Sequence, residues 1–154
     1  MMINYRYKTS HSIIGYTLIE TMISLFLLTT ALLGLAQLYN LSLSATHGSI
    51  MNDLATLQAE SMIERVRANP VAVTTGTYLS LSGEPSGTNC RTSHCSPTDL
   101  ARFDFREWNE ANRLLLPSGS GTITAVSSEQ YQITIQWVDG DSSPYYSLLF
   151  IPPL

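Results

Sequence analysis

Two groups of side chains in this sequence have the types and spacing that could do chemistry. Glu20 is a single carboxylate inside a long apolar run, and Cys90, His94 and Cys95 lie within six residues of one another. A carboxylate in apolar surroundings is costly unless a cation pairs with it. Two cysteines and a histidine can bind zinc, or the two cysteines can form a disulfide.

The spacing of the cysteine group disfavours metal binding and redox catalysis. Two of its three donors are neighbours in sequence, no second pair of ligands follows, and C-x4-C is not the CxxC motif of redox enzymes. The other two histidines, His11 and His47, lie far away in the sequence. A disulfide, in contrast, would close a short loop and contribute about 2 kcal/mol to stability. We therefore expect no metal site here.

Other segments lack the patterns of catalytic and cofactor sites. The glycines at 119 and 121 are not part of a G-x-S-x-G nucleophile elbow, and no glycine-rich phosphate loop is present. Asp139 and Asp141 lack the spacing of a calcium loop, although the pair alone could bind a cation weakly. The sequence therefore predicts a protein that is not an enzyme and carries no cofactor.

The run that contains Glu20 is long and apolar enough to span a membrane. No charged residue occurs from Thr21 to Asn52. Eleven Leu, Ile or Phe residues lie between Leu18 and Leu38, and at roughly −0.5 kcal/mol each they outweigh the roughly 3 kcal/mol cost of one acid. Arg6 and Lys8 are the only charges before Glu20, so the positive-inside rule places the N-terminus in the cytoplasm.

Three interpretations of this run differ in what they make of Glu20. A cleaved secretory signal needs small residues after its core, and residues 42–45 match that pattern poorly. A plain single-pass anchor leaves the acid as an unexplained cost. The third interpretation uses the order GYTLIE from Gly15 to Glu20, after a short basic leader. This order resembles the class III signal of type IV pilins and pseudopilins, in which a prepilin peptidase cuts after the glycine and methylates the new N-terminus.

The segment after the signal is predicted to be one long helix. No proline occurs between Tyr16 and Asn69, and Pro70 is the first strong stop signal. Residues 16–44 form a hydrophobic half, and residues 45–69 form an amphipathic half that we expect to pack on a globular domain. The expected apolar stripe begins at Leu43, just before the amphipathic half, and continues with Ile50, Leu54 and Leu57, with Met51, Met62 and Val66 beside it.

Residues 70–154 are predicted to form a globular α+β domain. Residues 71–98 have a loop composition with at most one short strand, around 77–81. A helix should follow, with Ser96 as its N-cap and Pro97 in its first position. Its expected apolar face is Leu100, Phe103, Trp108, Ala111 and Leu115. Three strands are expected in GTITAV, QYQITIQWV and YYSLLFI, the second burying Tyr131, Ile133, Ile135 and Trp137.

The order of these C-terminal features narrows the resemblance. The stretch from CRTSHCSPTDLARFDF to LLLPSGSG, followed by YQITIQW, is similar to the PilV-like family of minor pilins of type IV pili. The resemblance implies a type IV pilin-like α+β fold, with a long N-terminal helix packed on a small antiparallel sheet. It further implies a cleaved leader, residues 1–15, with cleavage after Gly15, methylation of Tyr16, an assembly carboxylate at Glu20, and a disulfide between Cys90 and Cys95.

The function implied by the resemblance is structural. A minor pilin would join other minor pilins and the major pilin, with the prepilin peptidase and the inner-membrane assembly platform as further partners, to prime pilus assembly for adhesion or twitching motility. It would sit in the inner membrane with its C-terminal domain in the periplasm, then in the filament. Alternatives are a pseudopilin of a type II secretion system and a membrane-anchored periplasmic enzyme. A net charge of −4 without a basic run predicts no nucleic-acid partner.

Overall fold

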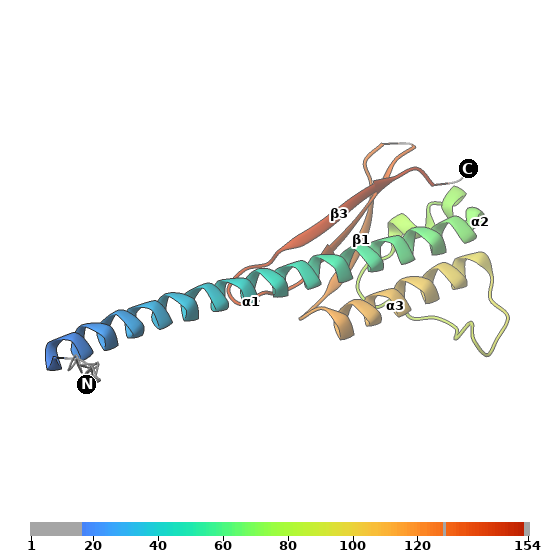
Figure 1. The fold of residues 1–154 in the computed structure, drawn as a ribbon. Helices are drawn as coiled ribbons and strands as arrows, with labels where there is room; N and C mark the ends of the chain where they lie inside the picture. The colour runs from blue at the N-terminus through green and yellow to red at the C-terminus, as the bar shows by residue number, and fades with distance from the viewer. Residues whose placement is uncertain (1–16, 128, 153–154) are drawn as a thin grey trace, which may run out of the picture. The chain divides into compact units, whose positions relative to one another are not determined.

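The computed structural model describes residues 17–127 and 129–152, and it divides the chain into two compact units, residues 1–45 and 46–154. The predicted α+β fold is confirmed, with a long N-terminal helix followed by short helices and a three-stranded antiparallel sheet (Figure 1). In chain order the elements are α1 (Leu18–Ala68), α2 (Pro70–Thr74), the 3-10 helix η1 (Thr77–Ser80), α3 (Pro97–Leu115), β1 (Ser120–Ala125), β2 (Tyr131–Gln136) and β3 (Tyr145–Phe150).

Helix α1 ends at the predicted place, and the reason is local. Asn69 leaves the helical region, with φ −128° and ψ 65°, as expected for a residue that precedes proline. Its side-chain oxygen then accepts a hydrogen bond from the Ala72 N–H at 3.4 Å and caps α2, which begins at Pro70. One residue therefore ends one helix and starts the next.

The buried side of α1 differs from the predicted stripe. Met62 and Val66 are buried as expected, whereas Leu43, Ile50 and Leu57 are exposed. The buried residues of α1 are Ala55, Ala59, Met62, Ile63 and Val66. The prediction was wrong for Leu43, Ile50 and Leu57, whereas Met51 and Leu54 are partly buried against the core. Two of the residues that the prediction missed are alanines, and small residues give a weak signal in a hydrophobicity pattern.

The sheet has the order β1-β2-β3, and β2 is its centre. Ile133 of β2 lies opposite Ile123 of β1 and Leu148 of β3. The predicted inward face of the central strand is confirmed, since Tyr131, Ile133, Ile135 and Trp137 are all buried. This face joins the buried residues of α1 and α3 in one hydrophobic core.

The segment around residues 77–81, for which the sequence allowed at most one short strand, forms the 3-10 helix η1. Gly76 turns the chain with φ 66°, a left-handed conformation that glycine adopts readily. Tyr78 is then fully buried. The aromatic side chain that gave the segment its strand-like composition is instead a core residue on a single helical turn.

Helix α3 begins as predicted but buries a different set of residues. The Ser96 hydroxyl accepts a hydrogen bond from the Asp99 N–H at 3.2 Å. Phe103 and Trp108 are buried as expected, while Leu115 is 44% exposed. Leu100 and Ala111 are only half-buried. The other buried residues of the helix are Ala101, Asp104, Phe105, Asn109 and Asn112. Polar side chains occupy much of the inner face, which hydrophobicity alone does not reveal.

Trp108 is the side chain that joins α3 to the other layers. Its indole N–H donates to the Gln58 carbonyl of α1 at 2.9 Å, and its ring packs against Phe105 with centroids 5.8 Å apart. A Cβ atom at Gly121 of β1 would lie 2.1 Å from the indole ring. The prediction that Trp108 is a core residue is confirmed, and β1 can lie this close only because position 121 carries no side chain.

We expect Gly121→Ala to lower the free energy of unfolding by about 1–3 kcal/mol, because the added methyl group overpacks against Trp108. Gly48→Ala is the matched control. A Cβ at Gly48 meets nothing within 4 Å, so this change should raise helix stability by up to about 1 kcal/mol. Urea unfolding of the two variants would measure the difference, and equal effects would contradict the close approach of β1 to the indole.

Candidate functional site

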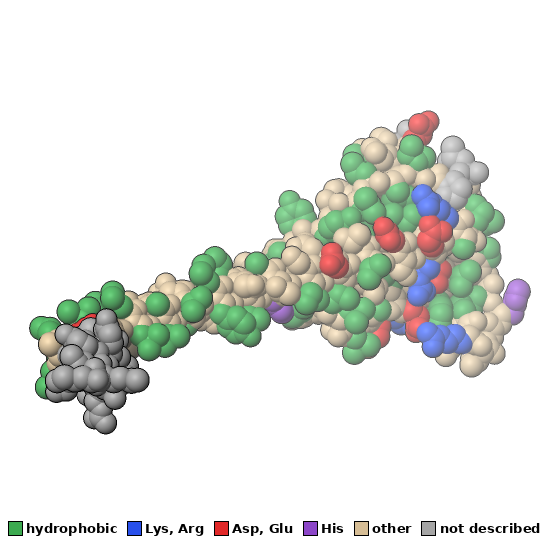
Figure 2. Space-filling model, in the orientation of Figure 1, with side chains coloured by type: hydrophobic (Ala, Val, Ile, Leu, Met, Phe, Trp, Pro, Cys, Tyr) green, Lys and Arg blue, Asp and Glu red, His purple; other side chains and the backbone are tan. Residues whose placement is uncertain are grey.

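Glu20 is a candidate functional residue because it places a carboxylate among apolar side chains, in the first turn of α1. Every described residue from Thr17 to Ala45 is exposed, and hydrophobic side chains cover much of the face of this half of the helix that Figure 2 shows. The Glu20 side chain is exposed, and no hydrogen bond or ion pair joins it to another described residue. Its carboxylate therefore has no partner within the described part of the chain.

The hydroxyl groups near Glu20 do have partners. The Thr21 hydroxyl donates to the Leu18 carbonyl at 2.8 Å, and the Thr29 and Thr30 hydroxyls donate to carbonyls one turn back at 2.9 Å. Such bonds let threonine sit in an apolar helix without an external partner. The Glu20 carboxylate, in contrast, has no partner group on this helix.

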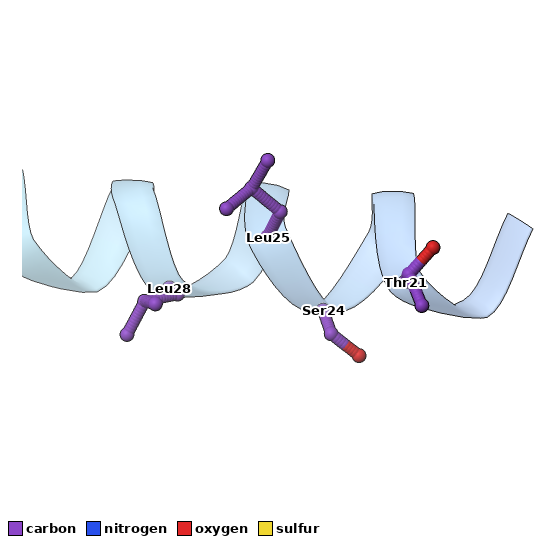
Figure 3. Close-up of a pocket in the computed structure, with 4 residues that line it drawn as sticks. All are labelled: Thr21, Ser24, Leu25 and Leu28. Carbon is purple, nitrogen blue, oxygen red and sulfur yellow. The ribbon is translucent and has the colours of Figure 1, made fainter. Parts of the chain in front are cut away.

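The surface beside Glu20 is not a ligand pocket. Thr21, Ser24, Leu25 and Leu28 line a shallow depression, and all four side chains come from successive turns of one helix (Figure 3). No second element closes over them in the described residues. A depression of this kind fits a flat apolar neighbour, such as lipid or another helix, better than a small molecule.

Helix α1 is long and apolar enough to cross a membrane, with a mean hydropathy of 2.0 over its most apolar 18-residue window. About 20 residues of an apolar helix span the roughly 30 Å of hydrocarbon in a bilayer. Gly15 and Tyr16, the predicted cleavage and methylation positions, lie outside the described residues.

The two cysteines form a disulfide, with an S–S distance of 1.98 Å and a Cα–Cα distance of 5.6 Å between Cys90 and Cys95. Both sulfurs are used in this bond, and no thiol is left for a metal or for nucleophilic chemistry. His94 is exposed beside the bond. The disulfide therefore acts as a loop closure.

Arginines hold the loop that carries the disulfide against α3. Arg113 pairs with Glu84 at 2.7 Å, and Arg91 pairs with Glu107. Arg106 donates to the Pro85 carbonyl at 3.5 Å and to the Gly87 carbonyl at 3.3 Å. Acidic and basic side chains alternate on the surface of residues 46–154 (Figure 2). Because each exposed pair contributes only about 0–1 kcal/mol, the disulfide and the arginines together, not any single pair, fix the loop.

A buried polar cluster joins the end of α1 to η1 and α3. Arg65 and Asp104 form an ion pair at 3.1 Å, and the Tyr78 hydroxyl donates to the other Asp104 oxygen at 3.4 Å. The Asn69 side-chain amide donates to the Pro97 carbonyl at 2.8 Å. Sequence analysis missed this cluster, although an acid between two phenylalanines, Phe103-Asp104-Phe105, was a signal that the acid is buried.

Burial raises the pKa of Asp104 above 3.8, and the Arg65 ion pair only partly opposes that effect. Burial and the neighbouring Asp104 charge also raise the pKa of Tyr78, so its hydroxyl stays protonated and donates. Burial makes the charged form of Asp104 unfavourable, so the ion pair adds little stability. The main role of the cluster is therefore to fix the relative positions of α1, η1 and α3.

The Asp104 shift predicts a pH effect of defined sign. An acid whose folded-state pKa is raised favours the folded chain below its unfolded pKa, and that contribution is lost as the pH rises through the folded pKa. We therefore expect the free energy of unfolding of the native chain to fall relative to that of Asp104→Asn as the pH rises through the acidic range above about pH 4. Urea titrations of both chains across this range measure the difference, and a constant or opposite difference would rule out the raised pKa.

No family model, curated protein or solved structure matches this chain. The site residues are consequently interpreted from their own chemistry and geometry. The structure keeps Glu20 in the exposed apolar half of α1, and the disulfide loop and the buried cluster in the unit of residues 46–154.

Proposed function

We propose that this chain is a minor pilin of the PilV-like kind, which joins other minor pilins to prime assembly of a type IV pilus. The observation that carries the proposal is Glu20, the only charged residue in the exposed apolar half of α1, residues 18–45, which follows the sequence Gly15-Tyr16. The α+β layout, in which the second half of the same helix packs on a small antiparallel sheet, is compatible with this function.

The proposed mechanism begins with removal of residues 1–15 and methylation of Tyr16. The new N-terminal amine would be a cation at the start of an apolar helix, four residues from Glu20. In a filament of parallel helices, the carboxylate of one subunit can pair with the amine of the next. Because an unpaired charge in apolar surroundings is unfavourable, the pair would set the axial position of each subunit.

A minor-pilin function implies both where the chain lies and which proteins it contacts. Before assembly the first half of α1 would lie in the inner membrane, with residues 46–154 in the periplasm, where the Cys90–Cys95 disulfide is stable. After assembly the same apolar surface would contact the helices of other minor pilins and of the major pilin. The assembly platform would supply the energy for this transfer.

We expect Glu20→Gln to reach the membrane normally but to enter sheared filaments at least about tenfold less than the native chain, because removing one partner of a buried ion pair costs roughly 3 kcal/mol. Asp53→Asn is the control, since Asp53 is an exposed acid on the same helix. Quantitative mass spectrometry of membranes and filaments measures both. Equal filament incorporation of Glu20→Gln and the native chain would contradict the proposed role of the carboxylate.

A further inference from the structure

Three polar atoms in the core have no hydrogen-bond partner among the described residues. They are Nδ2 and Oδ1 of the Asn112 side-chain amide and the indole nitrogen of Trp137. Both side chains are buried, Asn112 completely. Nearly all buried polar groups in folded proteins bond to another protein group or to ordered water, because an unpaired one is costly. These three atoms therefore call for a partner that the described side chains and backbone do not supply.

Helix α3 lies alongside β1 and brings Asn112 to the start of that strand. The Gly121 N–H donates to the Asn109 side-chain oxygen at 2.6 Å, and the Asn109 amide donates to the Gly121 carbonyl at 3.2 Å, which caps the edge of β1. About one turn further along α3, the Asn112 carbonyl lies where it would collide with a Cβ atom at Gly119. Asn112 can lie against the start of β1 because position 119 carries no side chain.

Trp137 approaches the same place from the central strand of the sheet. Gly121 of β1 pairs with Ile135 of β2. Two residues further in the same antiparallel register, Trp137 lies across from Gly119 on the inner face of the sheet, because side chains alternate along a strand. Trp137 is buried, as this alternation requires. The indole of Trp137 and the amide of Asn112 therefore both lie beside Gly119.

Hydrogen bonds hold the backbone on both sides of this corner of the core. The Val138 N–H, next to Trp137, donates to the Pro117 carbonyl at 2.8 Å. The Leu116 N–H donates to the Asn112 carbonyl at 2.9 Å, and the Leu116 side chain is buried. Because the corner is buried and its backbone is held, the missing partner has to be small, neutral and able both to accept and to donate hydrogen bonds.

We propose that one ordered water molecule is bound at this corner and bridges the Trp137 indole to the Asn112 side chain. The water accepts hydrogen bonds from the indole N–H and from the Asn112 Nδ2–H, and it donates one to Asn112 Oδ1. One water can use both groups of the amide because the N–H and the C=O lie side by side. Three hydrogen bonds are the usual number for a buried water, and here they satisfy all three atoms.

The other tryptophan of the core provides an internal comparison. Trp108 is as deeply buried as Trp137, but its indole N–H donates directly to the Gln58 carbonyl at 2.9 Å. Trp108 thus joins α3 to α1 by a direct bond, whereas Trp137 joins β2 to α3 through water. The inference concerns the core of residues 46–154 and does not depend on the proposed pilin function.

Nuclear magnetic resonance of the full-length chain in detergent micelles, with isotope-labelled tryptophan, tests the proposal. The chain contains two tryptophans, so it gives two indole N–H signals, and Trp137→Phe identifies the signal that it removes. In a rotating-frame experiment, direct contact with a bound water gives a cross peak opposite in sign to one from hydrogen exchange. We expect the contact cross peak with water at the Trp137 indole and none at the Trp108 indole.

Asn112→Leu should abolish the Trp137 cross peak, because it replaces the amide by an apolar side chain of similar size. The Trp108 signal reports in the same spectrum whether the fold is kept. Gln136→Leu is the matched control, since it removes an exposed amide next to Trp137 and should leave the cross peak unchanged.

Three results would each overturn the proposal. They are no water contact at Trp137, an equal contact at both indoles, and a Trp137 contact that persists in Asn112→Leu. The first result would indicate that the indole bonds to the Asn112 oxygen directly. The comparison of the two indoles in the native chain decides the proposal even where Asn112→Leu disturbs the fold.

Discussion

A single continuous helix has to serve two different environments, and the rest of the chain is arranged around that constraint. The first half of α1 exposes every described side chain, so it needs lipid or other helices around it. The second half buries Ala55, Ala59, Met62, Ile63 and Val66 in the core of residues 46–154. The packing of this face, more than helix propensity, stabilises the second half of the helix.

The packing of that second half depends on small residues and on a few directed polar contacts. Ala55 and Ala59 of α1 are fully buried in the core, and β1 comes close to Trp108 at Gly121. The indole N–H bond to Gln58 and the Arg65–Asp104 ion pair then hold α3 along the helix at two separate points. Apolar burial supplies the free energy, while these contacts select one arrangement of the layers.

The parts of the fold that could be predicted from sequence were those with a strong local signal. Residues that are neighbours in the sequence specify three of these features. They are the proline-free helix up to Asn69, the helix start at Ser96–Pro97 and the alternation in β2. The buried face of α1 and the 3-10 helix at Thr77–Ser80 were missed because tertiary packing decides them. The cap of the β1 edge by Asn109 joins residues that are 12 apart, and no local pattern reports it.

The candidate site was likewise predictable only where the signal is local. The residue order from Gly15 to Glu20 is such a local signal, and the structure adds that the carboxylate has no partner among described residues.

The measurement that tests the account most directly is intact and N-terminal peptide mass spectrometry of the chain from its native membrane, without reducing agent. The account predicts a chain that starts at Tyr16, carries one added methyl group and lacks two hydrogens at Cys90 and Cys95. A chain that starts at Met1, or one cut near Ala45, would contradict it.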